Sequence, residues 1–249
     1  GVKMGQLGTT TFRPPYTPLT FGAIVGRNVG EFFDITRKTP IHDWHVENKA
    51  EFENVGQWKR AWYYPRDNEN MHEAVQRESK AARDSAGILD ASTLGKIDIQ
   101  GSDASEFLNR VYTNAWSKLE IGKCRYGLML NEDGMVYDDG VTARLNENHY
   151  IMTTTTGGAA NVMSKLEDYL QTEWPELDVY LTSVTDHYAT ISICGPNSKK
   201  IVSKVIPDLD LTDSTFPHMS FKNAKINKVQ CRVMRISFTG EHSYEINIQ

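Results

Sequence analysis

Hydrophobic and polar residues follow two different periods along this chain, and the change of period separates its elements. The stretch MHEAVQRESKAARDSAG, which starts at Met71, has the spacing of an amphipathic helix that ends at Gly87. Beyond it, short apolar strands and helical segments alternate, and residues 126–144 are typical of a β-hairpin. Because the strands and helices mix without a strict βαβ repeat, the pattern favours an α+β fold over a doubly wound sheet.

The first 70 residues have a different character. Stretches such as FRPPYTPLTFGAIVG, KTPIHDWHVENK and GQWKRAWYYPRD are rich in aromatic residues and turn formers, and they show little periodicity. Aromatic side chains provide large apolar contact areas. We therefore expect residues 1–70 to form an extended aromatic-rich arm that wraps over this chain or a partner, and residues 71–249 to form the main folded region.

Two segments share one pattern. IDIQGSDASEFLNRV, from Ile97, and ISICGPNSKKIVSKV, from Ile191, each contain a short apolar strand, a glycine turn at Gly101 or Gly195, and a helix. The pattern favours two related lobes. Strand–turn–helix units are common, however, so a duplication and a chance similarity both stay open.

Composition narrows the classes of function. The chain has 249 residues, of which 39% are hydrophobic and 24% charged, and its formal net charge is −5. This charge gives no general attraction to nucleic acid or to an anionic membrane, and no apolar run reaches the length of a membrane span. The three cysteines are scattered, which favours reduced thiols in the cytoplasm. The start shows no signal peptide and the end interrupts a strand pattern, so we expect a fragment.

One pair of carboxylates stands out in NEDGMVYDDG, residues 131–140. In a continuous strand, Asp138 shares a face with residues that tolerate water, whereas Asp139 lies in a row of apolar and aromatic side chains. A carboxylate on such a face is costly unless a partner compensates it. Two interpretations stay open for Asp139: a functional carboxylate, or a structural one that caps the hairpin turn or pairs with Arg125.

Other candidate chemistry is less specific. His42 and His45 have the spacing of a ligand pair, but nothing completes a metal site, and we expect none. TTTTGGAAN, residues 153–161, follows a strand and opens a helix, so it could line a pocket or bind an anion, or be a plain turn. In FTGEHSYE, residues 238–245, Glu245 is an unusual carboxylate in an apolar strand, or a surface residue of an edge strand.

Several of these segments together resemble a known family. NEDGMVYDDGV, KCRYGLML, DASTLGKIDIQG and SFTGEHSYEI are similar to the aminomethyltransferases, the T-proteins of glycine cleavage. TFRPPYTPLTFGA, RKTPIHDWH, VGQWKRAWYYPR, TTTTGGAA, DYLQTEWPELDVYLTSVT and FPHMS resemble the alpha subunits of heterotetrameric sarcosine oxidases more specifically. The resemblance implies an aminomethyltransferase-like folate-binding fold of three lobes around a folate channel. This chain would contain the first two lobes, interleaved in sequence, and lack the C-terminal barrel.

The resemblance also implies roles for individual residues. Asp139 matches the essential aspartate beside the folate amine, and Glu245 the glutamate that binds the pterin ring. Tyr126, Leu94 and Val141 match residues that line the folate pocket. Three positions depart from the T-protein pattern and fit the sarcosine oxidase branch better: Phe238 and Ala143 replace tyrosines, and Thr155, expected to contact folate, replaces an asparagine.

The implied function is oxidative demethylation of sarcosine to glycine, in which this region transfers the methylene group to tetrahydrofolate and forms 5,10-methylenetetrahydrofolate. Asp139 would orient the folate amine, stabilise its developing charge and remove its proton. The implied partners are the other sarcosine oxidase subunits, chiefly the flavin-bearing beta subunit. Flavin (FMN or FAD) and NAD would belong to the full complex and not to this chain.

Two alternatives to this function stay open. The first is a related enzyme, namely an aminomethyltransferase or a dimethylglycine-oxidising or demethylating relative. The second is a non-catalytic folate-binding module whose aromatic arm docks onto a flavin-bearing partner.

Overall fold

The computed structural model describes residue 3, residues 20–25, residue 35 and residues 37–249. The chain divides into two units, residues 1–36 and residues 37–249. In the first unit, helix α1 spans Phe21–Val25. The rest of the predicted arm before residue 37 lies outside the described residues, apart from residues 3, 20 and 35.

The second unit begins with a small three-stranded sheet in the order β1-β3-β2. Its strands are β1 (Arg37–Lys38), β2 (Glu51–Val55) and β3 (Trp58–Tyr63), and helix α2 spans His42–Glu47. The later part of the predicted arm therefore contains regular structure that the weak periodicity did not indicate. The next helix, α3 (Met71–Asp84), confirms the amphipathic helix, and an Asn70–Glu73 capping box explains its start. It ends before the expected stop at Gly87, which instead begins the next strand.

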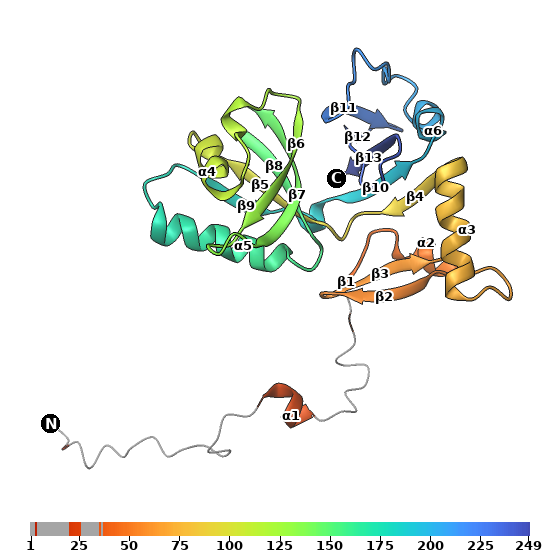
Figure 1. Cartoon of the computed structure of the whole chain (residues 1–249), viewed down its shortest axis with the longest axis horizontal. Helices are drawn as coiled ribbons and strands as arrows, with labels where there is room; N and C mark the ends of the chain where they lie inside the picture. The colour runs from red at the N-terminus through yellow and green to blue at the C-terminus, as the bar shows by residue number, and fades with distance from the viewer. Residues whose placement is uncertain (1–2, 4–19, 26–34, 36) are drawn as a thin grey trace. The chain divides into compact units, whose positions relative to one another are not determined.

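A five-stranded antiparallel sheet follows, in the order β6-β7-β8-β5-β9 (Figure 1). The pairing of β6 (Cys124–Leu130) with β7 (Val136–Asn146) confirms the predicted hairpin. The other strands are β8 (His149–Thr154), β5 (Gly95–Gln100) and β9 (Tyr180–Ser183). Helices α4 (Ala104–Val111) and α5 (Ala159–Asp168) contribute to the core on one face of this sheet, which includes Phe107, Trp116, Tyr150 and Leu166. A 3₁₀ turn at Trp116–Lys118 and a π turn at Tyr169–Glu173 complete this part.

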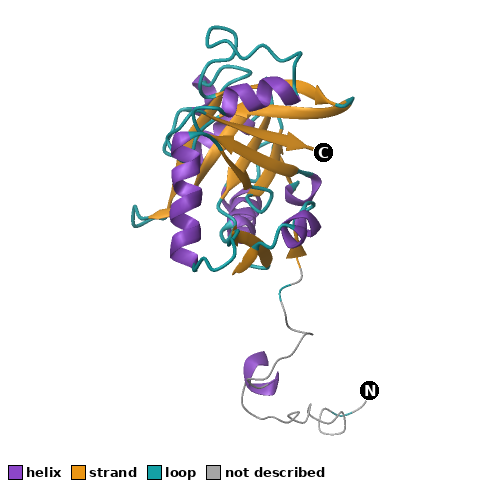
Figure 2. Cartoon of the chain, turned by 90° about the vertical axis from the view of Figure 1, so that its right-hand side faces the viewer, coloured by secondary structure: helices purple, strands orange, loops and turns teal. Residues whose placement is uncertain are grey.

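The second five-stranded sheet has the order β11-β12-β13-β10-β4. Its strands are β11 (Ser220–Ile226), β12 (Val229–Arg235), β13 (Ser243–Ile248), β10 (Ala189–Cys194) and β4 (Gly87–Asp90). Helix α6 (Ser198–Val205) packs on one face around Phe216 and Tyr244, and a 3₁₀ turn spans Thr185–His187 (Figure 2). Strand β4 comes before the other sheet in sequence but pairs with β10, so the two sheets are interleaved along the chain.

The repeated segments form equivalent units, one in each sheet. Gly101 joins β5 to α4 and Gly195 joins β10 to α6, with φ angles of 137° and 103° that favour glycine. An origin by duplication stays a prediction.

A third apolar cluster joins the free faces of the two sheets. It contains Cys124, Ala143 and Ile151 from one sheet, Met234 from the other, and Tyr188 and Ile236. The two interleaved sheets, each with its own helices, confirm the α+β class. The same arrangement turns one face of each sheet toward the other, and the candidate residues Asp139 and Glu245 lie on these faces.

Candidate functional site

Asp139 lies on β7, on the same face as two other predicted folate contacts. Tyr126 pairs in register with Val141, and Leu128 pairs with Asp139, so these four side chains share one face of the hairpin. The hydroxyl of Tyr126 donates a hydrogen bond of 2.7 Å to Oδ2 of Asp139. This bond raises the pKa of Tyr126, because ionising the phenol would place two negative charges side by side.

The structural alternative for Asp139 finds no support in its contacts. Arg125 lies on the opposite face of β6 and donates to the carbonyl oxygen of Ala115. The only hydrogen bond to the Asp139 carboxylate from another described side chain comes from Tyr126. Asp139 is partly buried, so its Oδ1 is left to accept a hydrogen bond from a ligand.

The prediction about Asp138 is wrong. Asp138 is 4% exposed, the more buried carboxylate of the pair. A bulge between Met129 and Leu130 shifts the register between β6 and β7. Tyr137 packs against the helix-covered core, and its ring centre lies 4.6 Å from Nζ of Lys165. The face that carries Asp138 is therefore not exposed to water, because α5 begins beside it.

Thr155 compensates the buried Asp138. Its hydroxyl donates to Oδ1 of Asp138 at 2.6 Å and its backbone N–H donates to Oδ2 at 3.2 Å. Burial raises the pKa of Asp138, and these two bonds oppose that shift. The structure thus gives Thr155 an internal partner, and its contact with folate stays a prediction.

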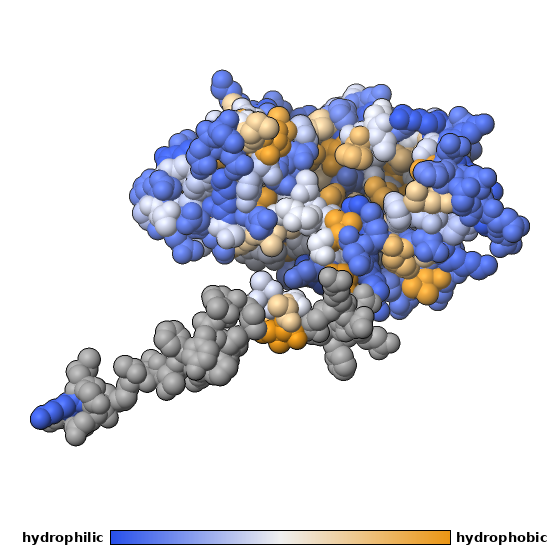
Figure 3. Space-filling model, turned by 60° about the horizontal axis from the view of Figure 1, so that its bottom comes forward, coloured by the Kyte–Doolittle hydropathy of each residue, from blue (hydrophilic) through white to orange (hydrophobic). Residues whose placement is uncertain are grey.

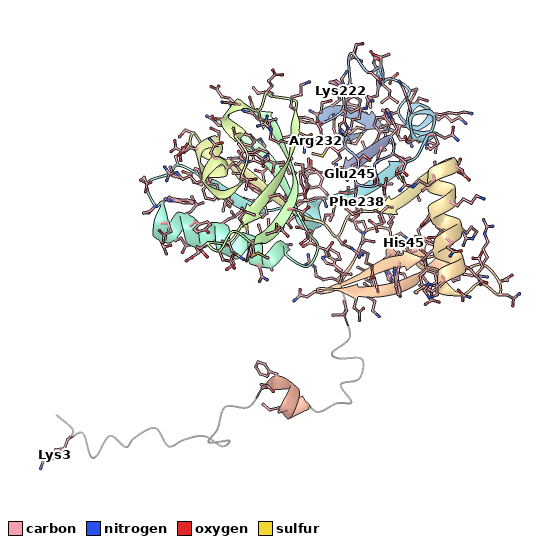
Figure 4. The ribbon with its side chains drawn as sticks, in the orientation of Figure 1. Lys3, His45, Lys222, Arg232, Phe238 and Glu245 are labelled. Carbon is pink, nitrogen blue, oxygen red and sulfur yellow. The ribbon has the colours of Figure 1, made fainter. Side chains whose placement is uncertain are left out.

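Glu245 faces the other sheet from β13. It pairs with Met234 and Ser192, and Met234 belongs to the cluster between the sheets. Burial raises the pKa of Glu245, and the charge of Lys96 opposes that shift. No side-chain hydrogen bond to the Glu245 carboxylate is found within the described part of the chain, so it is an available acceptor. Figure 4 labels Glu245 on β13.

Lys96 is a buried charged residue that the sequence pattern did not indicate. Its side chain alternates with Ile97 in β5, and it pairs with Thr153 on the face turned toward the second sheet. The residue is 1% exposed, and Nζ donates to the carbonyl oxygens of Ala91, Ser92 and Leu94 at 3.4, 3.2 and 3.0 Å. Burial lowers the pKa of Lys96 to about 8, against the opposing charges of Glu245, Asp90 and Asp186.

A second buried polar group was also missed. His45 Nε2 lies 2.8 Å from Oδ2 of Asp90, and His45 Nδ1 lies 2.5 Å from the Tyr64 hydroxyl. Burial pushes the pKa of Asp90 upward, but hydrogen bonds from Ser92, Thr39 and His45 outweigh it and lower the pKa. Both ring nitrogens of His45 are thus engaged within the protein, and this group fastens helix α2 to the end of β4.

Two cavities lie beside these residues. One, of about 430 Å³, is lined by Trp58, Gly95 and the TTTTGGAA turn at Thr156–Gly157 among others. The other, of about 370 Å³, is lined by residues such as Arg235, Glu241 and His242. Asp139 and Glu245 line neither of them.

The Asp139 face is partly apolar. It carries Tyr126, which is 49% exposed, together with Leu128 and Val141. The molecule shows hydrophobic residues among broad polar areas on one of its sides (Figure 3). A ligand beside Asp139 would meet an aromatic ring and apolar side chains.

Comparisons with known proteins identify relatives of this chain. The chain is 55% identical over 244 residues to sarcosine oxidase subunit alpha of Corynebacterium sp. (strain P-1), which covers 98% of this chain and 25% of that protein. It is 30% identical over 210 residues to the aminomethyltransferase of Listeria monocytogenes serotype 4a (strain HCC23), which covers 84% of this chain and 54% of that protein. The chain thus spans about a quarter of the first relative and about half of the second.

The fold is shared with a solved structure. The crystal structure of the glycine cleavage system aminomethyltransferase T from Bartonella henselae covers 85% of this chain and 53% of that chain, with a TM-score of 0.71 and 22% identity. The family described as the GCVT N-terminal domain matches residues 41–249. The chain therefore belongs to the GCVT family, the family of the glycine-cleavage aminomethyltransferases.

Proposed function

We propose that this chain is the folate-binding part of a sarcosine oxidase alpha subunit, and that it transfers a methylene group to tetrahydrofolate. The single observation that carries the proposal is the Tyr126–Asp139 pair on the β6–β7 hairpin. It places a carboxylate with a free oxygen on a partly apolar face, in a chain that is 55% identical to a sarcosine oxidase alpha subunit.

The residues present fit a reduced folate. The pterin ring has neighbouring N–H donors, and Glu245 is a partly buried carboxylate whose oxygens have no direct hydrogen-bond donor among the described side chains. The folate amines are neutral and gain charge only as they react, which suits a single carboxylate such as Asp139. Leu94 and Val141 supply the apolar contacts that a pterin or benzoyl ring needs, and both are partly buried.

The chemistry follows from these groups. Oxidation of sarcosine removes two electrons and gives the methylene iminium of glycine. A folate nitrogen attacks the methylene carbon, becomes cationic and loses a proton. A second folate nitrogen then displaces glycine and closes the ring of 5,10-methylenetetrahydrofolate. The Asp139 carboxylate is suited to stabilise the cationic nitrogen and to accept its proton, and Tyr126 orients the carboxylate through its hydrogen bond.

The remaining parts of the reaction belong to the rest of the assembly. We assign amine oxidation to a flavin (FMN or FAD) held with the other subunits, chiefly the beta subunit, and NAD to another part of the complex. A cytoplasmic location suits the three cysteines, which are buried free thiols. No helix in the described residues is long and apolar enough to cross a membrane.

Replacement of Asp139 tests the proposal. In the full-length protein with its natural subunits, Asp139→Asn should leave sarcosine-dependent oxygen uptake unchanged while lowering 5,10-methylenetetrahydrofolate formation by about 100-fold or more. Formaldehyde should replace the folate product, because the iminium hydrolyses in water when folate does not capture it. Both products are quantified from the same reaction.

The matched control is Glu132→Gln, which removes an exposed carboxylate from the turn of the same hairpin, 4.0 Å from Lys165. It should not change the product ratio. An unchanged ratio in Asp139→Asn as well would refute the role of Asp139.

A further inference from the structure

Lys96 places a positive charge where a neutral side chain would be less costly. It is 1% exposed, and its three hydrogen-bond acceptors are backbone carbonyl oxygens. A buried ammonium without a carboxylate in direct contact loses much of its hydration energy. A methionine could fill similar space without that loss, so the charge itself requires an explanation.

The charges around Lys96 come from three elements. Glu245 acts on it from β13, Asp90 from the end of β4 and Asp186 from the 3₁₀ turn before β10. Asp90 is already bonded to His45, and Asp186 to Arg37. Glu245 has no such partner, and Lys96 is the charged group that acts on it.

Lys96 also holds the segment that precedes it. Its bonds to Ala91, Ser92 and Leu94 close the loop between β4 and β5 around the ammonium group. Leu94 is one of the predicted folate contacts. The same side chain therefore touches the loop that carries Leu94 and acts electrostatically on Glu245, which lies on the facing sheet.

We propose that Lys96 is a positioning residue of the folate site, which holds the Ala91–Leu94 loop in place and directs a positive charge toward the sheet that carries Glu245, the expected acceptor of pterin N–H groups. This inference rests on the proposed folate-binding function. Glu245 is partly buried on β13, and the charge of Lys96 opposes the rise in its pKa that burial causes.

The pH dependence of folate binding tests the proposal. The probe is 5-formyltetrahydrofolate, a stable reduced folate, titrated calorimetrically into the full-length protein with its natural subunits between about pH 6 and 9.5. Wild-type affinity should fall above about pH 8 as Lys96 loses its proton.

Variants separate the electrostatic role from a packing role. Lys96→Met should weaken binding at pH 7 by about tenfold and remove the loss of affinity above about pH 8. Lys96→Arg keeps the charge, so it should bind more tightly than Lys96→Met at pH 7 and should also lack the loss of affinity above about pH 8. Lys225→Met, which makes the same change at an exposed position of β11, should leave the profile unchanged.

A Glu245→Gln background completes the test, because glutamine does not titrate. In this background only Lys96 and the ligand itself are expected to titrate, and Lys96→Met should cost less than about threefold in affinity. An equal loss in both backgrounds would reduce Lys96 to a packing role and overturn the inference. If Lys96→Met does not fold, the wild type and Lys96→Arg decide the question: affinity should fall above about pH 8 in the wild type but not in Lys96→Arg.

The two proposals fail in different ways. A wild-type protein that does not bind the probe at any pH refutes the proposed folate function. A second outcome refutes only the role of Lys96: the wild type binds the probe and Glu245→Gln weakens binding, but Lys96→Met leaves the pH profile of binding unchanged.

Discussion

Asp138 and Asp139 are adjacent in sequence, yet their carboxylates have opposite surroundings. Asp138 is buried and bonded to Thr155 at the start of the turn before α5, whereas Asp139 is held by a partly exposed tyrosine. Alternation along a strand separates neighbouring side chains, but it does not say which face is covered. The packing of α5 decides that question, and it reverses the expected burial of the pair.

At the residue scale, Lys96 should also change the pH dependence of stability. Its pKa is lowered from 10.5 to about 8 in the folded chain, so the unfolded chain binds more protons between these values. Stability therefore rises with pH across this window, and below about pH 8 the full cost of the buried charge is present. At 1.36 kcal/mol per unit, this cost is about 3 kcal/mol.

Lys96→Met removes this titration, so a comparison of the two proteins' free energies of unfolding isolates the contribution of Lys96. The free energy of unfolding of the wild type relative to Lys96→Met should increase by about 3 kcal/mol between pH 7.5 and 10.5. Urea denaturation of both proteins across that range measures it. Other groups, such as Cys124, titrate in both proteins and cancel in the difference. Parallel curves would show that the lysine keeps its ordinary pKa.

At the element scale, β7 and β8 approach each other unusually closely at Gly140. A Cβ at this position would lie 1.9 Å from the carbonyl oxygen of Thr153. Beside it, the Thr153 hydroxyl bridges the backbone N–H and C=O of Val141 at 2.9 and 3.0 Å. The Thr153 side chain thus replaces the backbone hydrogen bonds between the two strands at this point, next to Asp139.

Gly140→Ala should destabilise the protein by about 2–4 kcal/mol, because the clash is with backbone and cannot be relieved by a rotamer change. Denaturant unfolding measures the loss. Gly157→Ala is the matched control, since a Cβ there meets nothing within 4 Å and its change should stay within about 0.5 kcal/mol. Equal stability of the two variants would contradict the close approach of the strands.

At the scale of the whole molecule, the cluster between the two sheets brings distant segments together. Ile151 and Met234, which meet in this cluster, are far apart in sequence. The same packing places Lys96 where Glu245 acts on it. A site assembled from both sheets requires the two lobes to fold together, which is consistent with their interleaved sequence.

The amine substrate is tested on the complete assembly. We expect sarcosine to support oxygen uptake with a higher kcat/KM than dimethylglycine, because the chain is 55% identical to a sarcosine oxidase alpha subunit. A preference for dimethylglycine would favour the related demethylating enzymes. Oxygen uptake without any folate product, at saturating tetrahydrofolate, would favour a non-catalytic folate-binding module.

The sequence by itself determined the elements and the family. The period of MHEAVQRESKAARDSAG indicated α3, and the alternation around the turn at Asp133–Gly134 indicated the β6–β7 hairpin, because these signals depend on local spacing. The motifs also identified Asp139 and Glu245 as candidate residues. Regular structure at residues 37–63 was missed, because its strands are short and depend on contacts with the rest of the chain.

Only the tertiary structure decided which polar residues are buried. Lys96 and Asp98 alternate with Ile97 and Ile99, so the sequence alone makes them a solvent-facing row. The second sheet covers part of that face, and Lys96 becomes buried opposite Glu245 because packing between sheets leaves no local trace in sequence. Asp138 follows the same reasoning, since its burial depends on a bulge and on a helix that begins about 20 residues later.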